Sequence, residues 1–122
     1  MSRPVVAAID ASKIFGIRAG GRSGHRFTGV WPVVVDGRVF ARSWTLTFGG
    51  WYRTLLDDPL CTLQIGERQV RVRAVRPRGT AILDAIEDAY AAKYTTAASR
   101  KYVRGFRIPR RRAATMEFQP RS

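Results

Sequence analysis

The stretch from Gly29 to Asp58, GVWPVVVDGRVFARSWTLTFGGWYRTLLDD, decides the fold. It contains two β-prone runs, Val33 to Val35 and Val39 to Trp44, joined by Asp36-Gly37-Arg38. Asp-Gly between apolar runs is the strongest short-range hairpin signal. The stretch therefore predicts a tight turn at Asp36-Gly37, with Val33 to Val35 paired antiparallel to Val39 to Ala41.

A short helix is predicted directly after this hairpin. The β-branched run stops at Phe48-Gly49-Gly50, and Trp51 to Leu56 has helical spacing. Asp58-Pro59 must end the helix, because proline lacks the N-H that the next turn needs. The predicted order is strand, turn, strand, diglycine and helix.

The diglycine before this helix is a candidate anion site. The first N-H groups of a helix lack intrahelical partners and glycine lets a ligand approach closely. Guanidinium forks and hydroxyls from both sides would complete a phosphate or carboxylate site; they belong to Arg42, Ser43, Thr45, Thr47 and Arg53. The alternative is a buried hairpin with an ordinary Gly-Gly loop and solvated arginines. The residues alone favour this alternative, because they form neither a Walker motif nor a GxGxxG.

Elements before the hairpin are less distinct. Residues 1–20 are expected to form an N-terminal arm, with a short helix or turn over Asp10 to Phe15. Arg26 to Val30 reads as a strand that leads into the hairpin. Pro32 implies an edge strand or a bulge, because proline cannot donate to a ladder.

A second hairpin and a longer helix follow Pro59. Leu60 to Ile65 and Gln69 to Val75 flank Gly66-Glu67-Arg68, and their alternation predicts a half-buried antiparallel sheet. Thr80 is the expected N-cap of a helix that runs to about Tyr94. Its apolar face comprises Ile82, Leu83, Ile86, Ala89, Tyr90 and Tyr94, whereas Asp84, Glu87 and Asp88 are expected on a solvated face.

The segment from Arg100 to Arg112 holds seven positive residues and no acid, with Tyr102 and Phe106 interleaved. Basic residues beside aromatics are typical of surfaces that bind single-stranded nucleic acid. With Gly105 and Pro109, the segment is equally well read as a mobile, exposed basic loop. Ala113 to Gln119 then alternates as a last strand.

Length and composition narrow the possible classes of protein. A chain of 122 residues, 45% of them hydrophobic, suits a single domain over residues 1–122. The absence of an 18-residue apolar run and of a signal-peptide pattern makes a cytoplasmic protein with no membrane span the expectation. One cysteine, Cys61, and one histidine, His25, are too few for a structural metal site.

The net charge of +13 favours polyanionic partners, either nucleic acid or a phosphate-bearing small molecule. All but three of the 22 positive residues are arginine, which a GC-rich genome would also produce.

Several segments together resemble the deazaflavin-dependent nitroreductase family. They are Gly21-Arg22-Ser23-Gly24-His25-Arg26, the Asp36-Gly37-Arg38 turn, Arg42-Ser43 followed by Gly49-Gly50-Trp51-Tyr52, and Leu55 to Pro59. With the helix end at Ala89 to Tyr94, the chain is more similar still to small uncharacterised bacterial relatives of that family. The similarity covers roughly residues 20 to 119.

This resemblance implies an α+β fold, an antiparallel split β-barrel of the flavin-reductase kind, with a short helix after the first hairpin and one longer helix. It implies a homodimer that binds FMN or a deazaflavin, and a small oxidoreductase or a relative that has lost the cofactor. The residues that match are Arg22 and Ser23 in the first loop, Ser43, Gly49 and Gly50 facing the phosphate, and Trp51 and Tyr52 at the helix start. The first loop is one residue shorter than the family pattern, and Asp58 replaces its asparagine.

No catalytic residue is assigned. A His25–Cys61 pair would need two strands to bring it together, and Asp57-Asp58 reads better as a helix end. Two functions of different class remain: a flavin-binding or deazaflavin-binding protein, and a basic nucleic-acid-binding module. A barrel that binds neither is the third interpretation.

Overall fold

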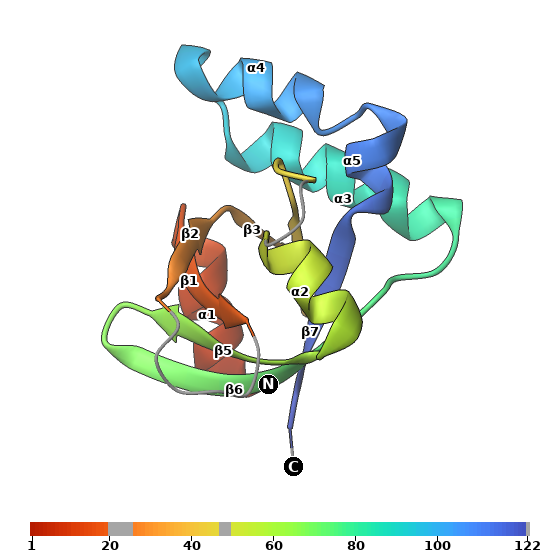
Figure 1. Ribbon diagram of the computed structural model, residues 1–122. Helices are drawn as coiled ribbons and strands as arrows, with labels where there is room; N and C mark the ends of the chain where they lie inside the picture. The colour runs from red at the N-terminus through yellow and green to blue at the C-terminus, as the bar shows by residue number, and fades with distance from the viewer. Residues whose placement is uncertain (20–25, 47–49, 122) are drawn as a thin grey trace.

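The computed structural model describes residues 1–19, 26–46 and 50–121. Within them the chain is α+β, with seven antiparallel strands in a nearly closed barrel and five helices (Figure 1). The sheet order is β2-β1-β5-β6-β7-β4-β3. The strands are β1 Phe15–Ala19, β2 Thr28–Val30, β3 Pro32–Val35, β4 Arg38–Arg42, β5 Leu60–Ile65, β6 Arg68–Val75 and β7 Thr115–Pro120. The predicted antiparallel barrel is confirmed.

The first hairpin forms as predicted. β3 and β4 pair antiparallel with Val33 opposite Phe40 and Val35 opposite Arg38. Asp36 and Gly37 have φ values of 52° and 75°, the positive values that a two-residue turn of this hand requires. Pro32 lies on an edge strand of the sheet, where its missing N-H costs no ladder bond.

The second hairpin and the helix after the diglycine are also confirmed. β5 and β6 pair over six residues, from Leu60 opposite Arg73 to Ile65 opposite Arg68. Val72 and Ala74 of β6 are buried while Arg71 and Arg73 are exposed, as the alternation predicts. The helix α2, Trp51–Asp57, ends before Pro59.

The N-terminal segment is not an arm with a helix or turn over Asp10 to Phe15, so that interpretation was wrong. It forms helix α1, Arg3–Ala11, and strand β1. Ser2 caps α1, since its hydroxyl accepts from Val5 N at 3.4 Å, and Val5 and Ile9 are buried one turn apart. Residues 1–19 therefore contribute to the core.

The basic segment 100–112 is not a loop. Most of it lies in two helices, α4 Ala97–Gly105 and α5 Pro109–Ala113, with residues 106–108 between them. Both helices lie with α3, Thr80–Lys93, at one end of the molecule (Figure 1). Thr96 caps α4 and Pro109 begins α5, a position where proline is favoured. The prediction that this segment is exposed holds for five of its seven positive residues: Arg100, Lys101, Arg104, Arg107 and Arg110.

Two clusters of buried side chains hold the fold together. The barrel interior includes Ile9, Phe15, Leu63 and Phe118. A second cluster, on the other face of the β3–β4 hairpin, joins Val33 and Phe40 to residues of α3 and α4. The N-cap of α3 is Gly79 and not Thr80, which is already helical.

Among the described residues, no helix combines the length and the apolar character needed to cross a bilayer.

Candidate functional site

The candidate site begins where β3 and β4 separate. After the Pro32–Ala41 pair, the next rung of the ladder would be a bond from Arg42 N to Trp31 O. The hydroxyl of Tyr90, on α3, stands between these two atoms instead: it accepts from Arg42 N at 2.9 Å and donates to Trp31 O at 2.6 Å. Burial raises the pKa of Tyr90 far above its usual range, although the bond from Arg42 opposes the shift, so the phenol keeps its proton. Tyr90 thus separates the strand ends while satisfying both backbone groups.

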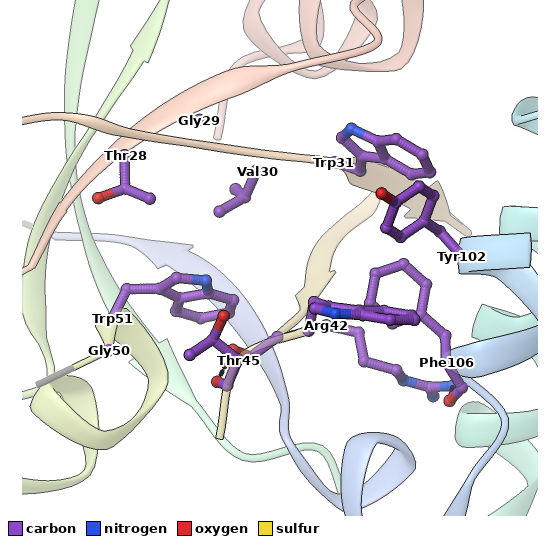
Figure 2. Close-up of a pocket in the computed structure, with 12 residues that line it drawn as sticks. Thr28, Gly29, Val30, Trp31, Arg42, Thr45, Gly50, Trp51, Tyr102 and Phe106 are labelled. Atoms are coloured by element: carbon purple, nitrogen blue, oxygen red, sulfur yellow. Dashed lines mark hydrogen bonds between the residues drawn. The ribbon is translucent and has the colours of Figure 1, made fainter. Parts of the chain in front are cut away.

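A pocket of about 510 Å³ lies at this point, and we call it the aromatic pocket. Its volume falls within the range of small-molecule sites. In Figure 2, Trp51 and Thr28 lie on one side of the pocket and Trp31 and Tyr102 on the opposite side. The residues that line it are Thr28, Gly29, Val30, Trp31, Arg42, Ser43, Trp44, Thr45, Gly50, Trp51, Tyr102 and Phe106.

One wall of the aromatic pocket is a cluster of rings. Trp31 stacks on Tyr94 with centroids 4.7 Å apart and planes at 9°. The Trp44 ring meets Tyr102 edge-on at 4.9 Å and Phe106 at 5.8 Å. Such pairs stabilise one another beyond their burial, so the wall is preformed.

Trp44 is held from its outer side by α5 and α4. The guanidinium carbon of Arg111 lies 3.5 Å from the centroid of a Trp44 ring, and Arg111 Nε donates to Trp44 O at 3.0 Å. Gly105 makes room for the indole, because a Cβ there would lie 2.4 Å from Trp44 Cζ3. The position of Trp44 therefore depends on two residues of the basic segment.

The guanidinium of Arg42 is committed to partners inside the protein. It donates to Thr115 Oγ1 at 2.8 Å, to Phe106 O at 3.1 Å and to Glu87 Oε1 at 3.3 Å, and its side chain is fully buried. Burial lowers the pKa of Arg42, and Tyr90 and Glu87 oppose the shift. Arg42 therefore joins β4 to α3, α4 and β7, and its charged end is already satisfied without an external anion.

The acidic residues of α3 were expected on a solvated face, and for Glu87 this was wrong. Glu87 Oε1 accepts from Arg112 at 2.7 Å as well as from Arg42. Arg112 also pairs with Asp84 at 2.7 Å. These acids therefore bind α5 and β4 to α3.

The structure brings together part of the predicted binding set. Ser43, Gly50 and Trp51 line the aromatic pocket, as does Arg42. Tyr52 is buried and donates to Ala113 O at 3.0 Å, and Arg53 is exposed on α2; neither lines the pocket. The other predicted residues, Arg22, Ser23, Thr47 and Gly49, lie outside the described residues.

Sequence reasoning missed the aromatic wall. All three tryptophans of the chain line the pocket, and their clustering within 21 residues was the available signal. Tyr102 and Phe106 were interpreted as part of a basic nucleic-acid surface. They instead point into the pocket wall, so base stacking on them would compete with the contacts to Trp31 and Trp44. Binding of a single strand by segment 100–112 stays a prediction.

The fold and the site define an antiparallel split barrel with an aromatic pocket at the separated end of its first hairpin. The chain belongs to the DUF2255 family, described as an uncharacterized protein conserved in bacteria, whose family model matches residues 5–118. The expected relationship to uncharacterised bacterial relatives is thus confirmed. No curated protein matches the chain.

Solved structures that share the fold include two that cover this chain completely. The conserved hypothetical protein Rv2991 from Mycobacterium tuberculosis has a TM-score of 0.64 at 14% identity, over 100% of this chain and 81% of that one. An FAD-binding protein (mll6688) from Mesorhizobium loti has a TM-score of 0.60 at 11% identity, over 100% of this chain and 91% of that one. Both cover the whole chain, so the likeness concerns the complete barrel.

Proposed function

We propose that the aromatic pocket binds the ring system of a flavin or deazaflavin. The observation that carries the proposal is the arrangement of the walls: Trp51 on one side and Trp31 with Tyr102 on the other, around about 510 Å³. A flat conjugated ring placed between aromatic side chains gains stacking and edge contacts. The FAD-binding neighbour with the same fold supports this choice of ligand.

Polar groups at the pocket suit the edge of such a ring. Ser43 Oγ donates to Thr45 O at 2.6 Å, which leaves its lone pairs to accept from a ligand N-H. Gly29 and Gly50 also line the pocket, and they let a ligand approach the backbone closely. These groups would orient the ring, while the aromatic wall would exclude water from it.

For the phosphate of the cofactor we propose Arg53 and Thr47, which the sequence placed at the anion site, together with Arg22, Ser23 and Gly49, which match the first loop and the phosphate-facing segment in the family resemblance. Arg42 holds the wall of the pocket in this proposal, because its donors are occupied by Thr115, Phe106 and Glu87.

A bound flavin or deazaflavin would supply hydride transfer, and the protein would act as a small oxidoreductase. The residues of the chain would contribute binding, orientation and exclusion of water. A barrel that keeps the pocket but has lost the cofactor is the outcome that a failed titration would support.

The test is a direct titration. Purified protein is titrated with FMN, with FAD and with a deazaflavin, and tryptophan fluorescence is followed, since all three tryptophans line the pocket. We expect saturable quenching by at least one ligand. No quenching at ligand concentrations up to 100 times that of the protein would overturn the proposal.

Two variants on the same helix then localise the site, with ligand absorbance as the readout. Trp51→Ala removes a pocket ring, whereas Leu56→Ala truncates an exposed side chain of α2. Loss of one aromatic stacking partner costs about 1–3 kcal/mol, or roughly 5- to 150-fold in affinity. Leu56→Ala should bind like the wild type. Equal affinities for the two variants would show that the ligand does not bind in the aromatic pocket.

A further inference from the structure

A patch of positive charge lies on the outer face of β1, β5 and β6, and none of its residues lines the aromatic pocket. Arg18 of β1 pairs in register with Thr62, and Thr62 pairs with Arg71. Arg73, two residues further along β6, lies between Leu60 and Gln119. Residues in register share a face of the sheet, so these three arginines project from the same side. We call Arg18, Arg71 and Arg73 the arginine face.

The charge on the arginine face is not neutralised within the protein. Arg71 and Arg73 are exposed and form no ion pair in the described part of the chain. Their paired neighbours Thr62, Leu60 and Gln119 carry no charge, and Arg121, whose N-H donates to Arg71 O at 3.4 Å, is itself positive. β6 is a central strand, yet the helices α3, α4 and α5 lie at the other end of the molecule (Figure 1).

Arginines elsewhere on the sheet are treated differently. Arg38 makes two bonds to Glu117, at 2.8 and 3.0 Å, and Arg42 pairs with Glu87. Within the described residues, carboxylates therefore pair with the arginines of β4, whereas no carboxylate forms an ion pair with Arg71 or Arg73 of β6. Like charges close together on one sheet face destabilise it, so an anionic partner would relieve a cost that the fold leaves in place.

We propose that the arginine face binds the phosphate backbone of duplex nucleic acid without reading its sequence. Residues two apart on a strand are about 6.6 Å apart, and strands two positions apart are separated by about 9.5 Å. The three guanidinium groups are thus spread over an area of a rigid surface and do not lie on one line. Such a spread lets them contact phosphates on both strands of a duplex. Arginine, glutamine and threonine, the polar side chains in the paired rows of this face, are usual phosphate-contacting types.

Other anionic partners fit the arginine face less well. Its paired rows contain no aromatic residue on which the bases of a single strand could stack. Phe27, beside Arg18, is half-buried, and the Arg18 guanidinium already lies over its ring at 4.7 Å. Leu60 is the one large apolar side chain in these rows, and it is half-buried, whereas interfacial membrane binding needs a broad apolar face. The proposal is independent of the aromatic pocket and of any flavin.

The test measures binding of a fluorescein-labelled 20-base-pair duplex by anisotropy over a series of salt concentrations. The double variant Arg71→Gln/Arg73→Gln is compared with Arg104→Gln/Arg107→Gln, which removes the same charge from exposed positions on or next to α4. Loss of two phosphate contacts reduces the slope of log K against log salt by about 1.8, which at 0.1 M salt means roughly sixtyfold weaker binding. The control should keep most of the wild-type slope. Arg18→Gln alone should reduce the slope by about 0.9.

Several results would overturn the proposal. An equal loss in both double variants would show that net charge acts without a defined surface, and a larger loss in the control would place the contact on α4. Absence of duplex binding by the wild type at 50 mM salt would exclude duplex nucleic acid as the partner. Stronger retention on vesicles of anionic lipid than on duplex, lost in Arg71→Gln/Arg73→Gln, would identify a membrane surface instead. Circular dichroism and thermal unfolding confirm that each variant is folded.

Discussion

Arg42→Met is the substitution that best separates a ligand-binding arginine from a structural one. Methionine keeps an unbranched apolar stem in the buried channel but removes every donor. Thr115 Oγ1 and Phe106 O lose bonds of 2.8 and 3.1 Å, and Leu83 O loses a longer one of 3.5 Å. The substitution therefore acts at the junction of β4, β7, α3 and α4.

The expected loss follows from what remains around Glu87. Removal of one partner of a buried ion pair costs about 3–5 kcal/mol, mainly because the other charge is left uncompensated. Glu87 retains Arg112 at 2.7 Å and its side chain is 15% exposed, so its charge stays compensated in part. We therefore expect the lower end of the range, a decrease of about 3 kcal/mol in the free energy of unfolding.

The assay is equilibrium urea unfolding followed by tryptophan fluorescence, with Arg107→Met as the matched control. Arg107 is exposed and directly follows Phe106, the C-cap of α4. Its replacement should change the free energy of unfolding by less than about 0.5 kcal/mol. Wild-type stability in Arg42→Met, together with a loss of flavin affinity of tenfold or more, would refute the structural role and return Arg42 to the predicted anion site.

Three further predictions concern the pocket and the barrel core. Gly105→Ala should displace the Trp44 ring, because its Cβ would lie 2.4 Å from that ring, and should weaken ligand binding more than it lowers the melting temperature; unchanged affinity would contradict this. Tyr90→Phe should lower the free energy of unfolding by about 1–3 kcal/mol, since Arg42 N and Trp31 O lose their partner. Wild-type stability of this variant in urea would contradict the prediction and would show that Arg42 N and Trp31 O bond to each other when the hydroxyl is absent. Burial raises the pKa of the Cys61 thiol to about 12, with Arg121 opposing, so the native thiol should resist a disulfide reagent at pH 8 and react on unfolding. Its contribution to stability should be complete below about pH 8.5 and decline as the pH rises toward 12, a decline that Cys61→Ala should lack.

The parts of the fold that the sequence predicted depend on residues close together in the chain. The Asp36-Gly37 turn, the alternation of β6 and the stop at Pro59 each involve interactions within a few positions. Local chemistry of this kind can be read from one segment at a time. Helices α4 and α5 carried local signals too, the Thr96 cap and Pro109 at a first turn, but the density of charge suggested a loop.

The candidate site depends on contacts that are remote in the chain. Trp31, Trp51 and Tyr102 come from three different parts of the chain, and the sheet order and the packing of α4 bring them together. The role of Arg42 in the structure differs from the predicted role for the same reason. It was predicted to bind an anion together with residues at positions 43–53, whereas its side chain binds Leu83, Glu87, Phe106 and Thr115, at least 41 positions away.

Turn chemistry and side-chain alternation were thus fixed by the sequence alone, because backbone geometry and the two faces of a strand constrain them locally. Which arginines are neutralised and which stay free was decided by tertiary structure. Arg42 and Arg71 have similar settings in the sequence, each directly after an apolar residue of a β-prone run. Pairing of β4 with β7 and coverage by α3 bury the first against Glu87, whereas the open outer face of β6 leaves the second in water.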